Sequence, residues 1–332
     1  MNTRKLGQTG PEISPMGYGA MSFSNFYGPT SEAQSFAILD AMRDWGVNHI
    51  DTSNIYGMGG SEETIGRYFA ANKGAEQEFV IATKAGITRD ADNNRCFRND
   101  RAHLEAELDK SLARMGVEHV DLFYVHRRQE DMPIEEVVEA LVALKQTGKI
   151  GSFGFSEIAP SSLRRAAAVH PVAAVQSEYS LQTRSPELGL VQACAELGAA
   201  FVAFSPVGRS LLTDHPLSKE AVESIGFFQT NPRFVEPNLS ANMAATDKFR
   251  ALAADMGEPA AALANAWLLA QGEHVIPIPG TRSVTHFREC VRGGEITLSA
   301  DDLAQIEAVL PVGWAHGDRY STDQWVGPER FA

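Results

Sequence analysis

Eight short β-rich runs alternate along this chain with longer stretches of helical periodicity, and this alternation constrains the fold more than any other feature. Each run is rich in β-branched and aromatic residues and ends in small or polar ones. The predicted strands lie at residues 15–21, 47–53, 79–85, 120–126, 150–156, 173–180, 199–206 and 274–280. Parallel strands need crossover helices, and eight such units close into a (β/α)8 TIM barrel of the α/β class. A doubly wound open sheet is the alternative.

Amphipathic stretches between these strands predict the helices that surround the barrel. Ser31 and Ser61 precede two of the stretches and suit the N-cap position, because acidic residues follow each of them in the first helical turn. The predicted helices span residues 32–45, 62–71, 102–115, 134–146, 186–197, 243–256, 259–271 and 299–311.

Three segments depart from a plain barrel. Residues 4–14 have a turn-rich centre between apolar residues, which predicts a hairpin that caps the barrel bottom. The stretch after the seventh strand is too long for one loop and one helix, so residues 208–242 are predicted to form a long loop or short helices over the barrel mouth. The helix at 299–311 is an extra C-terminal one. Since no repeat or linker divides the chain, we expect residues 1–332 to form a single domain.

Charge and cysteine content narrow the class of protein. The chain carries 29 Lys and Arg against 42 Asp and Glu, a net charge of −13, which disfavours nucleic acid or an anionic membrane as the partner. Its three cysteines are scattered without a CxxC pair, so neither a disulfide framework nor a metal site is expected, and a reducing cytoplasm fits. The first 15 residues lack an apolar core and no run approaches ~18 apolar residues, so neither export nor membrane insertion is expected.

Four ionisable residues stand at or just beyond the ends of predicted strands, where barrels place their functional groups. Asp51 and Tyr56 lie in NHIDTSNIYG, Lys84 in FVIATKAG and His126 in VDLFYVHR. A phenol is a poor acid near neutral pH unless a cation lies beside it and a carboxylate holds that cation. Singly, each residue can be explained as a turn residue, a strand terminus or a packed side chain. Together they indicate proton transfer, because a buried Asp and Lys are costly unless they pair.

The order, spacing and local sequences of these four residues resemble the aldo-keto reductase family, over roughly residues 4–309. The resemblance implies a catalytic tetrad of Asp51, Tyr56, Lys84 and His126. It also implies hydride transfer from NADP(H), with NAD(H) possible, to a small aldehyde or ketone, and the reverse oxidation of an alcohol. Tyr56 is then the proton donor, Lys84 lowers the Tyr56 pKa, Asp51 fixes the ammonium, and His126 orients the carbonyl oxygen.

The resemblance further assigns residues to the cofactor. Ser156 and Gln176 match the partners of the nicotinamide carboxamide, Phe204 matches the ring that stacks on the nicotinamide, and Glu157 stands where short-chain members have asparagine. The pyrophosphate loop comprises Ser205, Pro206, Val207, Gly208 and Arg209. The adenosine phosphate end comprises Gly280, Thr281, Arg282, His286, Glu289 and Cys290.

The adenosine end departs from the family signature at two positions. His286 replaces the usual arginine and Cys290 the usual asparagine, while Arg282 is a possible compensating cation. Because a partly neutral imidazole binds phosphate less strongly than a guanidinium fork, we expect a weaker preference for NADPH over NADH than the full signature gives.

Two other functions remain open at this point. Lys84 at a strand end is also compatible with the Schiff-base lysine of a class I aldolase. A nicotinamide-sensing subunit without turnover is the non-catalytic alternative.

Two groups of residues near the predicted mouth have less specific interpretations. After the first strand, apolar side chains are candidates for the walls of the site: Met21, Phe23, Phe26 and Tyr27. A set of arginines is expected to be solvated surface, with an anion-binding rim as the alternative: Arg89, Arg95, Arg98, Arg101, Arg127 and Arg128.

Overall fold

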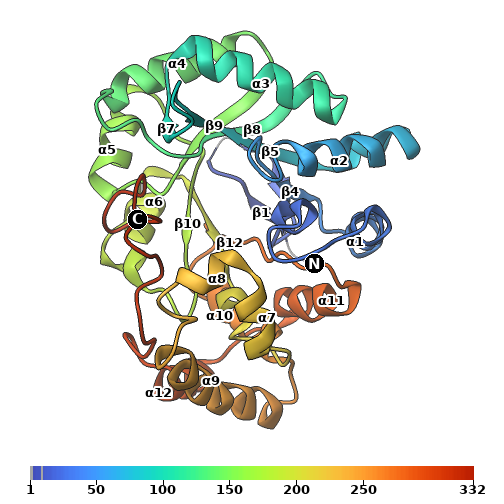
Figure 1. The fold of residues 1–332 in the computed structure, drawn as a ribbon, viewed down its shortest axis with the longest axis vertical. Coiled ribbons are helices and arrows are strands. Elements are labelled where there is room, and N and C mark those ends of the chain that lie inside the picture. The colour runs from blue at the N-terminus through green and yellow to red at the C-terminus, as the bar shows by residue number, and fades with distance from the viewer. Residues whose placement is uncertain (1–2, 9) are drawn as a thin grey trace.

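The computed structural model describes residues 3–8 and 10–332, and its centre is a sheet of eight parallel strands in chain order (Figure 1). The strands are β3 (Tyr18–Gly19), β4 (His49–Asp51), β5 (Val80–Ala85), β8 (Val120–Val125), β9 (Ile150–Ser156), β10 (Ala174–Glu178), β11 (Ala200–Phe204) and β12 (Val275–Pro277). Each of the eight predicted strands is therefore confirmed.

The two outer strands of this sheet meet, which makes it a barrel. The N–H of Gly17 donates to Pro277 O and the N–H of Gly19 donates to Pro279 O, both at 3.0 Å. Glycine is required here, because a Cβ on Gly280 would lie 2.4 Å from the carbonyl oxygen of Gly19. The open sheet is excluded, and the (β/α)8 fold is confirmed.

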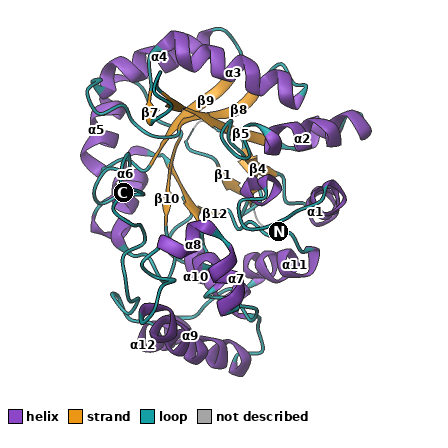
Figure 2. Cartoon of the chain, viewed as in Figure 1, coloured by secondary structure: helices purple, strands orange, loops and turns teal. Residues whose placement is uncertain are grey.

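Helices cover the outside of the barrel (Figure 2). They are α1 (Glu32–Trp45), α2 (Gly60–Ala71), α3 (Arg101–Met115), α4 (Ile134–Gln146), α5 (Pro160–Val169), α6 (Leu190–Leu197), α10 (Ala260–Leu269) and α11 (Val284–Arg292). In α4 the buried side chains recur at helical spacing, at Val137, Leu141 and Leu144, so one apolar face packs on the strands. Short 3-10 helices occupy Ala20–Ser24, Ala75–Glu78, Ser185–Leu188, Gly208–Ser210 and Gly293–Glu295.

The N-caps of α1 and α2 differ from one another. Ser31 caps α1 as predicted, and Gln34 completes a capping box. Ser61 does not cap α2, which starts two residues earlier than predicted with Gly59 as its cap. The prediction for Ser61 was wrong because its hydroxyl is used elsewhere, donating to the carbonyl oxygen of Ala20 at 2.9 Å.

The predicted N-terminal hairpin is present as β1 (Arg4–Lys5) paired antiparallel with β2 (Glu12–Ile13), while Thr9 at its centre lies outside the described residues. Leu6 and Ile13 belong to the apolar cluster inside the barrel. Arg4 donates to the carbonyl oxygen of Gly272 at 2.7 Å, just before β12. The hairpin therefore closes the barrel at the end where the strands begin.

The long segment after β11 forms short helices and then two longer ones, as predicted. These are α7 (Lys219–Ser224), α8 (Gly226–Thr230) and α9 (Asn238–Asp255), followed by α10. The extra C-terminal helix α12 (Ala300–Val309) packs against α9 (Figure 1). A second hairpin, β6 (Ile87–Arg89) with β7 (Arg95–Phe97), follows β5 and was not predicted. In the part of the chain that the structure describes, no helix is long and apolar enough to span a membrane.

Candidate active site

The four predicted catalytic residues come together at the ends of β4, β5 and β8. Asp51 is the last residue of β4, Lys84 lies near the end of β5, and His126 directly follows β8. Tyr56 sits in the loop after β4. Lys84, Asp51 and His126 are 0%, 1% and 7% exposed, so an ion pair forms in a dry environment.

The Lys84 ammonium uses its three N–H donors on three different acceptors. It pairs with Asp51 Oδ1, donates to the carbonyl oxygen of Thr52 at 2.8 Å, and donates to the phenol oxygen of Tyr56 at 3.4 Å. Because the phenol oxygen accepts from Lys84, its own O–H remains free to donate to a ligand. The geometry is that of a positioned acid and not of a nucleophilic amine, which needs a free lone pair.

Both carboxylate oxygens of Asp51 have a hydrogen-bonding partner. Its Oδ1 pairs with Lys84, and its Oδ2 accepts from the Gln176 Nε2 amide at 2.7 Å. The family resemblance implies that Gln176 contacts the cofactor carboxamide, and the structure adds this contact to the carboxylate of Asp51. The Gln176 side chain therefore joins the proton-transfer group to the predicted cofactor position.

The pKa of Tyr56 is raised, and not lowered as the sequence suggested. Burial raises the Tyr56 pKa and the Asp51 charge raises it further, while Arg127 opposes both. Burial likewise lowers the pKa of Lys84 against the opposing effect of Asp51. The direction differs from the prediction mainly because desolvation is the largest effect on the phenol, and the negative charge of Asp51 acts in the same direction as desolvation.

His126 is placed as a neutral donor. Its Nδ1 lies 3.0 Å from Ser53 Oγ, and its ring meets the Tyr56 ring edge-on with centroids 5.9 Å apart. Burial lowers the His126 pKa well below its usual value, and the charges of Arg127, Lys84 and Arg95 lower it further. In the tautomer whose Nδ1 accepts from the Ser53 hydroxyl, the neutral imidazole carries its proton on Nε2, where it can polarise a carbonyl oxygen.

A cavity of about 510 Å³ runs from these residues across the C-terminal ends of the strands. Asp51, Tyr56 and His126 line one part of it, and the buried Lys84 lies behind them. Of the predicted cofactor residues, all except Gly208 line the cavity: Ser156, Gln176, Phe204, Ser205, Pro206, Val207, Arg209, Gly280, Thr281, Arg282, His286, Glu289 and Cys290. One continuous space therefore connects the tetrad with the predicted adenosine end.

Three of the four predicted wall residues also line this cavity, namely Met21, Phe26 and Tyr27. Phe23 instead belongs to the core, where its ring packs against Tyr18 with centroids 5.2 Å apart. Tyr320 and Gln324 from the C-terminal tail complete the wall, and the sequence did not indicate them because the tail has no periodicity.

The arginines beyond β8 are not solvated surface. Arg127 is 8% exposed, and its Nη1 donates to the carbonyl oxygen of His126 at 2.6 Å and to Ser156 Oγ at 3.1 Å. Arg128 pairs with Glu329 of the tail at 2.7 Å. Arg95 is exposed but lines the cavity rim, while the remaining arginines of the group are exposed as expected: Arg89, Arg98 and Arg101. The surface prediction was thus wrong for Arg127 and Arg128, because the tail and the strand ends cover them.

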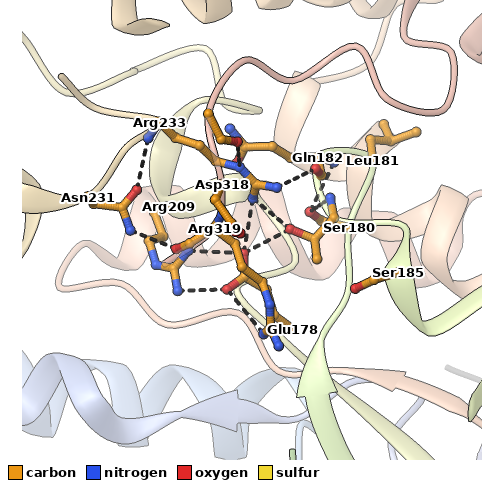
Figure 3. Close-up of polar contacts among 12 residues, drawn as sticks. Glu178, Ser180, Leu181, Gln182, Ser185, Arg209, Asn231, Arg233, Asp318 and Arg319 are labelled. Atoms are coloured by element: carbon orange, nitrogen blue, oxygen red, sulfur yellow. Dashed lines mark hydrogen bonds and ion pairs between the residues drawn. The ribbon is translucent and has the colours of Figure 1, made fainter. Parts of the chain in front are cut away.

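A buried charge cluster that the sequence did not reveal holds the tail against the barrel (Figure 3). Glu178 at the end of β10 pairs with Arg209 at 2.8 Å and with Arg233 at 3.3 Å. Arg319 of the tail pairs with Glu157 at 2.7 Å. These residues are far apart in sequence, so only the fold brings them together.

At the adenosine end, Arg282 and α11 lie beside the loop after β3. Arg282 Nη1 donates to the carbonyl oxygen of Pro29 at 2.6 Å, and Ser283 caps α11. The N-terminal turn of a helix together with a guanidinium suits a phosphate. Cys290 is buried, and burial raises the pKa of its thiol to about 12, so this residue packs and does not react.

Three potential metal ligands also meet at this end. His215 stacks on His286 with centroids 4.8 Å apart, and its Nε2 lies 3.7 Å from Glu289 Oε1. The donor atoms of the three residues lie within 4.8 Å of one another. The sequence spacing gave no hint of this group because His215 comes from the long segment after β11.

Comparisons with known proteins show which family the chain resembles. The pattern described as the Aldo/keto reductase family matches residues 15–311. The NADP(+) aldo-keto reductase yakc of Schizosaccharomyces pombe is 35% identical over 322 residues, which cover 96% of this chain and 94% of that protein. A probable aldo-keto reductase 1 of Glycine max is 34% identical, covering 95% and 91%. A glycerol dehydrogenase from Gluconobacter oxydans has a similar structure, with a TM-score of 0.80 at 27% identity, covering 93% and 94%.

Proposed function

We propose roles for individual residues on the premise that this chain belongs to the aldo/keto reductase family and is an NADP-dependent oxidoreductase that reduces carbonyl compounds. Bound NADPH supplies a hydride for the carbonyl carbon. The side chains around the cavity donate the proton and orient the carbonyl group. The observation that carries the proposal is the Lys84 ammonium, which contacts both Asp51 and the Tyr56 phenol oxygen.

Tyr56 donates its proton to the carbonyl oxygen as negative charge develops there. Lys84 donates to the same phenol oxygen and so stabilises the tyrosinate that remains. Asp51 holds the ammonium in place, and His126 donates from Nε2 to the carbonyl oxygen. In the reverse direction the same groups accept a proton from an alcohol.

One continuous cavity is lined by residues that we assign to the cofactor. We assign the carboxamide to Ser156 and Gln176, and the nicotinamide face to Phe204. The pyrophosphate is assigned to the loop from Ser205 to Arg209, where Ser205, Gly208 and Arg209 all have positive φ. The 2′-phosphate is assigned to Arg282 and His286, which lie at the far end of the same cavity.

The two alternative functions lack support. The Lys84 side chain is fully buried and its three N–H groups are all directed to oxygen acceptors, which disfavours imine formation. The relatives are reductases and dehydrogenases, and the four catalytic side chains are all present, which argues against a subunit that only senses nicotinamide.

Three further assignments accompany the proposed reaction. We propose a small carbonyl compound as the partner, since the site is a cavity and the net charge of −13 is unsuited to nucleic acid. We propose the cytoplasm as the location, because the three cysteines are unpaired. Finally, we propose that residues 1–332 act as one catalytic domain.

Replacing Tyr56 by Phe tests the proposal. The variant Tyr56→Phe removes the proton donor, so kcat for aldehyde reduction is expected to fall by about 100-fold or more. NADPH affinity, measured by fluorescence titration, is expected to stay near the wild-type value. Tyr68→Phe is the matched control and is expected to keep the wild-type activity, since Tyr68 does not line the cavity and its hydroxyl donates to Asp40 at 2.6 Å. If Tyr56→Phe keeps more than about a tenth of the activity, Tyr56 is not the donor.

A further inference from the structure

The arginines of the cavity divide into two pairs with different surroundings. Four arginines line the cavity: Arg95, Arg127, Arg209 and Arg282. Arg209 is neutralised by Glu178, and Arg282 lies at the adenosine end. Arg95 and Arg127 lie at the other end, where the charges of both act on His126. Within residues 3–8 and 10–332, neither forms an ion pair with a carboxylate.

Arg127 is fixed in position although part of its guanidinium lacks a partner. Its Nη1 donates to the backbone of His126 and to Ser156 Oγ, which anchors the group beside the catalytic residues. Its Nε is buried and unpartnered, and its Nη2 has no protein partner among the described residues. A buried cation with unused donors is costly unless an anion compensates it.

Arg95 lines the same cavity. It lies on β7 of the hairpin after β5, and its guanidinium lies over the Phe97 ring at 5.2 Å from the centroid. Its pKa is lowered by desolvation and by the nearby charge of Arg127. Two like charges in one cavity repel each other, so an anion between them would stabilise both.

Among the residues that the structure describes, no carboxylate supplies that anion. Asp51 is the acidic residue at this end of the cavity, and both of its oxygens are occupied, by Lys84 and by Gln176. The protein as a whole carries a net charge of −13 and repels anions at long range. Two uncompensated arginines in an otherwise acidic protein are therefore best explained as binding a negatively charged ligand.

We propose that Arg95 and Arg127 form a subsite for an anionic group on the substrate, so that the preferred substrates are aldehydes or ketones bearing a carboxylate or a phosphate. The inference rests on the proposed function and specifies its substrate class. Arg127 offers its unused Nε and Nη2 donors in a position fixed by the Nη1 contacts, and Arg95 offers a second guanidinium from the β6–β7 hairpin. The aromatic walls at Phe26 and Tyr320 contact the uncharged part.

Matched substrates test the subsite in the wild-type holoenzyme. We would compare kcat/KM for 4-oxobutanoate with that for its methyl ester, and for glyceraldehyde 3-phosphate with that for glyceraldehyde. At least one anion of these pairs is expected to be preferred by roughly tenfold or more, because hydrogen bonds to charged groups are the stronger ones. A preference for the anion in the first pair alone shows that the subsite binds a carboxylate. A preference in the second pair alone shows that it binds a phosphate.

Variants then locate the contact. Arg95→Gln and Arg127→Gln are expected to lower kcat/KM for the preferred anion by roughly ten- to hundredfold, mainly through KM, with a much smaller loss for its neutral counterpart. Arg127→Lys is expected to recover part of the loss, because the charge returns without the fork. Arg98→Gln, which removes an exposed guanidinium paired with Asp100, is expected to change neither rate. Should Arg127→Gln fail to fold, the effect of Arg95→Gln on the anion preference alone tests the subsite.

Failure of the anion subsite can be distinguished from failure of the proposed reductase function. Reduction of the neutral compounds with no preference for either anion, or an anion preference that survives both Gln variants, overturns the subsite and leaves the reductase function intact. Absence of NADPH oxidation with all four compounds and with a broad panel of neutral aldehydes overturns the proposed function itself.

Discussion

At the scale of single residues, the chemistry depends on how one buried ammonium distributes its three hydrogen bonds. Lys84 donates to a carboxylate, a backbone carbonyl and a phenol, so its orientation is fixed from three sides. A lysine that forms an imine must instead lose a proton and approach a carbonyl carbon. Because Lys84 is buried behind Asp51 and Tyr56, its amine suits the hydrogen-bonding role and not imine formation.

Replacement of this lysine gives the prediction at the residue scale. Lys84→Met keeps the length of the side chain but removes the charge, so kcat is expected to fall by about 100-fold and its pH profile to shift. Wild-type protein treated with substrate and borohydride is expected to show no added mass on Lys84 by peptide mass spectrometry. Lys149→Met, at a surface ion pair with Asp109, is the control for both measurements. An adduct on Lys84 would instead favour the aldolase reaction.

At the scale of elements, the C-terminal tail becomes part of the site through the buried charge cluster of Figure 3. Glu178 on β10 holds Arg209 from the loop after β11 and Arg233 from the loop before α9. Arg319 lies beside them, 3.9 Å from Glu178, and the next residue of the tail, Tyr320, lines the cavity. The three arginine charges keep the pKa of this fully buried carboxyl below its usual value although desolvation raises it.

Removing the central carboxylate is expected to loosen all of these elements together. Glu178→Gln leaves Arg209 and Arg233 buried without their partner, so the free energy of unfolding in urea is expected to fall by about 3–5 kcal/mol. The tail is also expected to be cleaved faster in limited proteolysis. Glu135→Gln breaks an exposed pair with Arg165 and is expected to behave like the wild type. Equal stability of the two variants would show that the cluster does not anchor the tail.

These elements also show how far the sequence could predict the structure. The eight strands and the 32–45 helix were predictable because their patterns are local: buried β-rich runs, and a Ser31 cap followed by a Gly46 terminus. The start of α2 was not, because a long-range contact to Ala20 takes up the hydroxyl of Ser61. Local motifs were enough to predict that Asp51, Tyr56, Lys84 and His126 lie together. The positions of Arg127, Arg233 and Arg319 depend on contacts with distant segments, which no local sequence pattern reveals.

At the scale of the whole molecule, several buried groups make the fold sensitive to acid. Burial lowers the pKa of His49, and also lowers the pKa of His126 and His274. A histidine whose pKa is lower in the folded state binds its proton more readily when unfolded, so its contribution to stability is lost as the pH falls below about 6.5. Glu178, with a lowered pKa, adds a second loss below about 4.3, as the pH falls through its folded pKa.

His49 provides the sharpest test of this acid sensitivity. Its Nδ1 donates to the carbonyl oxygen of Val80 at 3.0 Å, while its Nε2 is buried without a partner, so a second proton has no acceptor. We expect the free energy of unfolding to fall between pH 7 and pH 5, with His49 contributing up to ~1.4 kcal/mol per pH unit. Urea unfolding at several pH values should show a shallower slope for His49→Gln, while the exposed His119→Gln keeps the wild-type slope. If His49→Gln retains the full slope, the proton uptake that accompanies unfolding in this range belongs to other buried histidines.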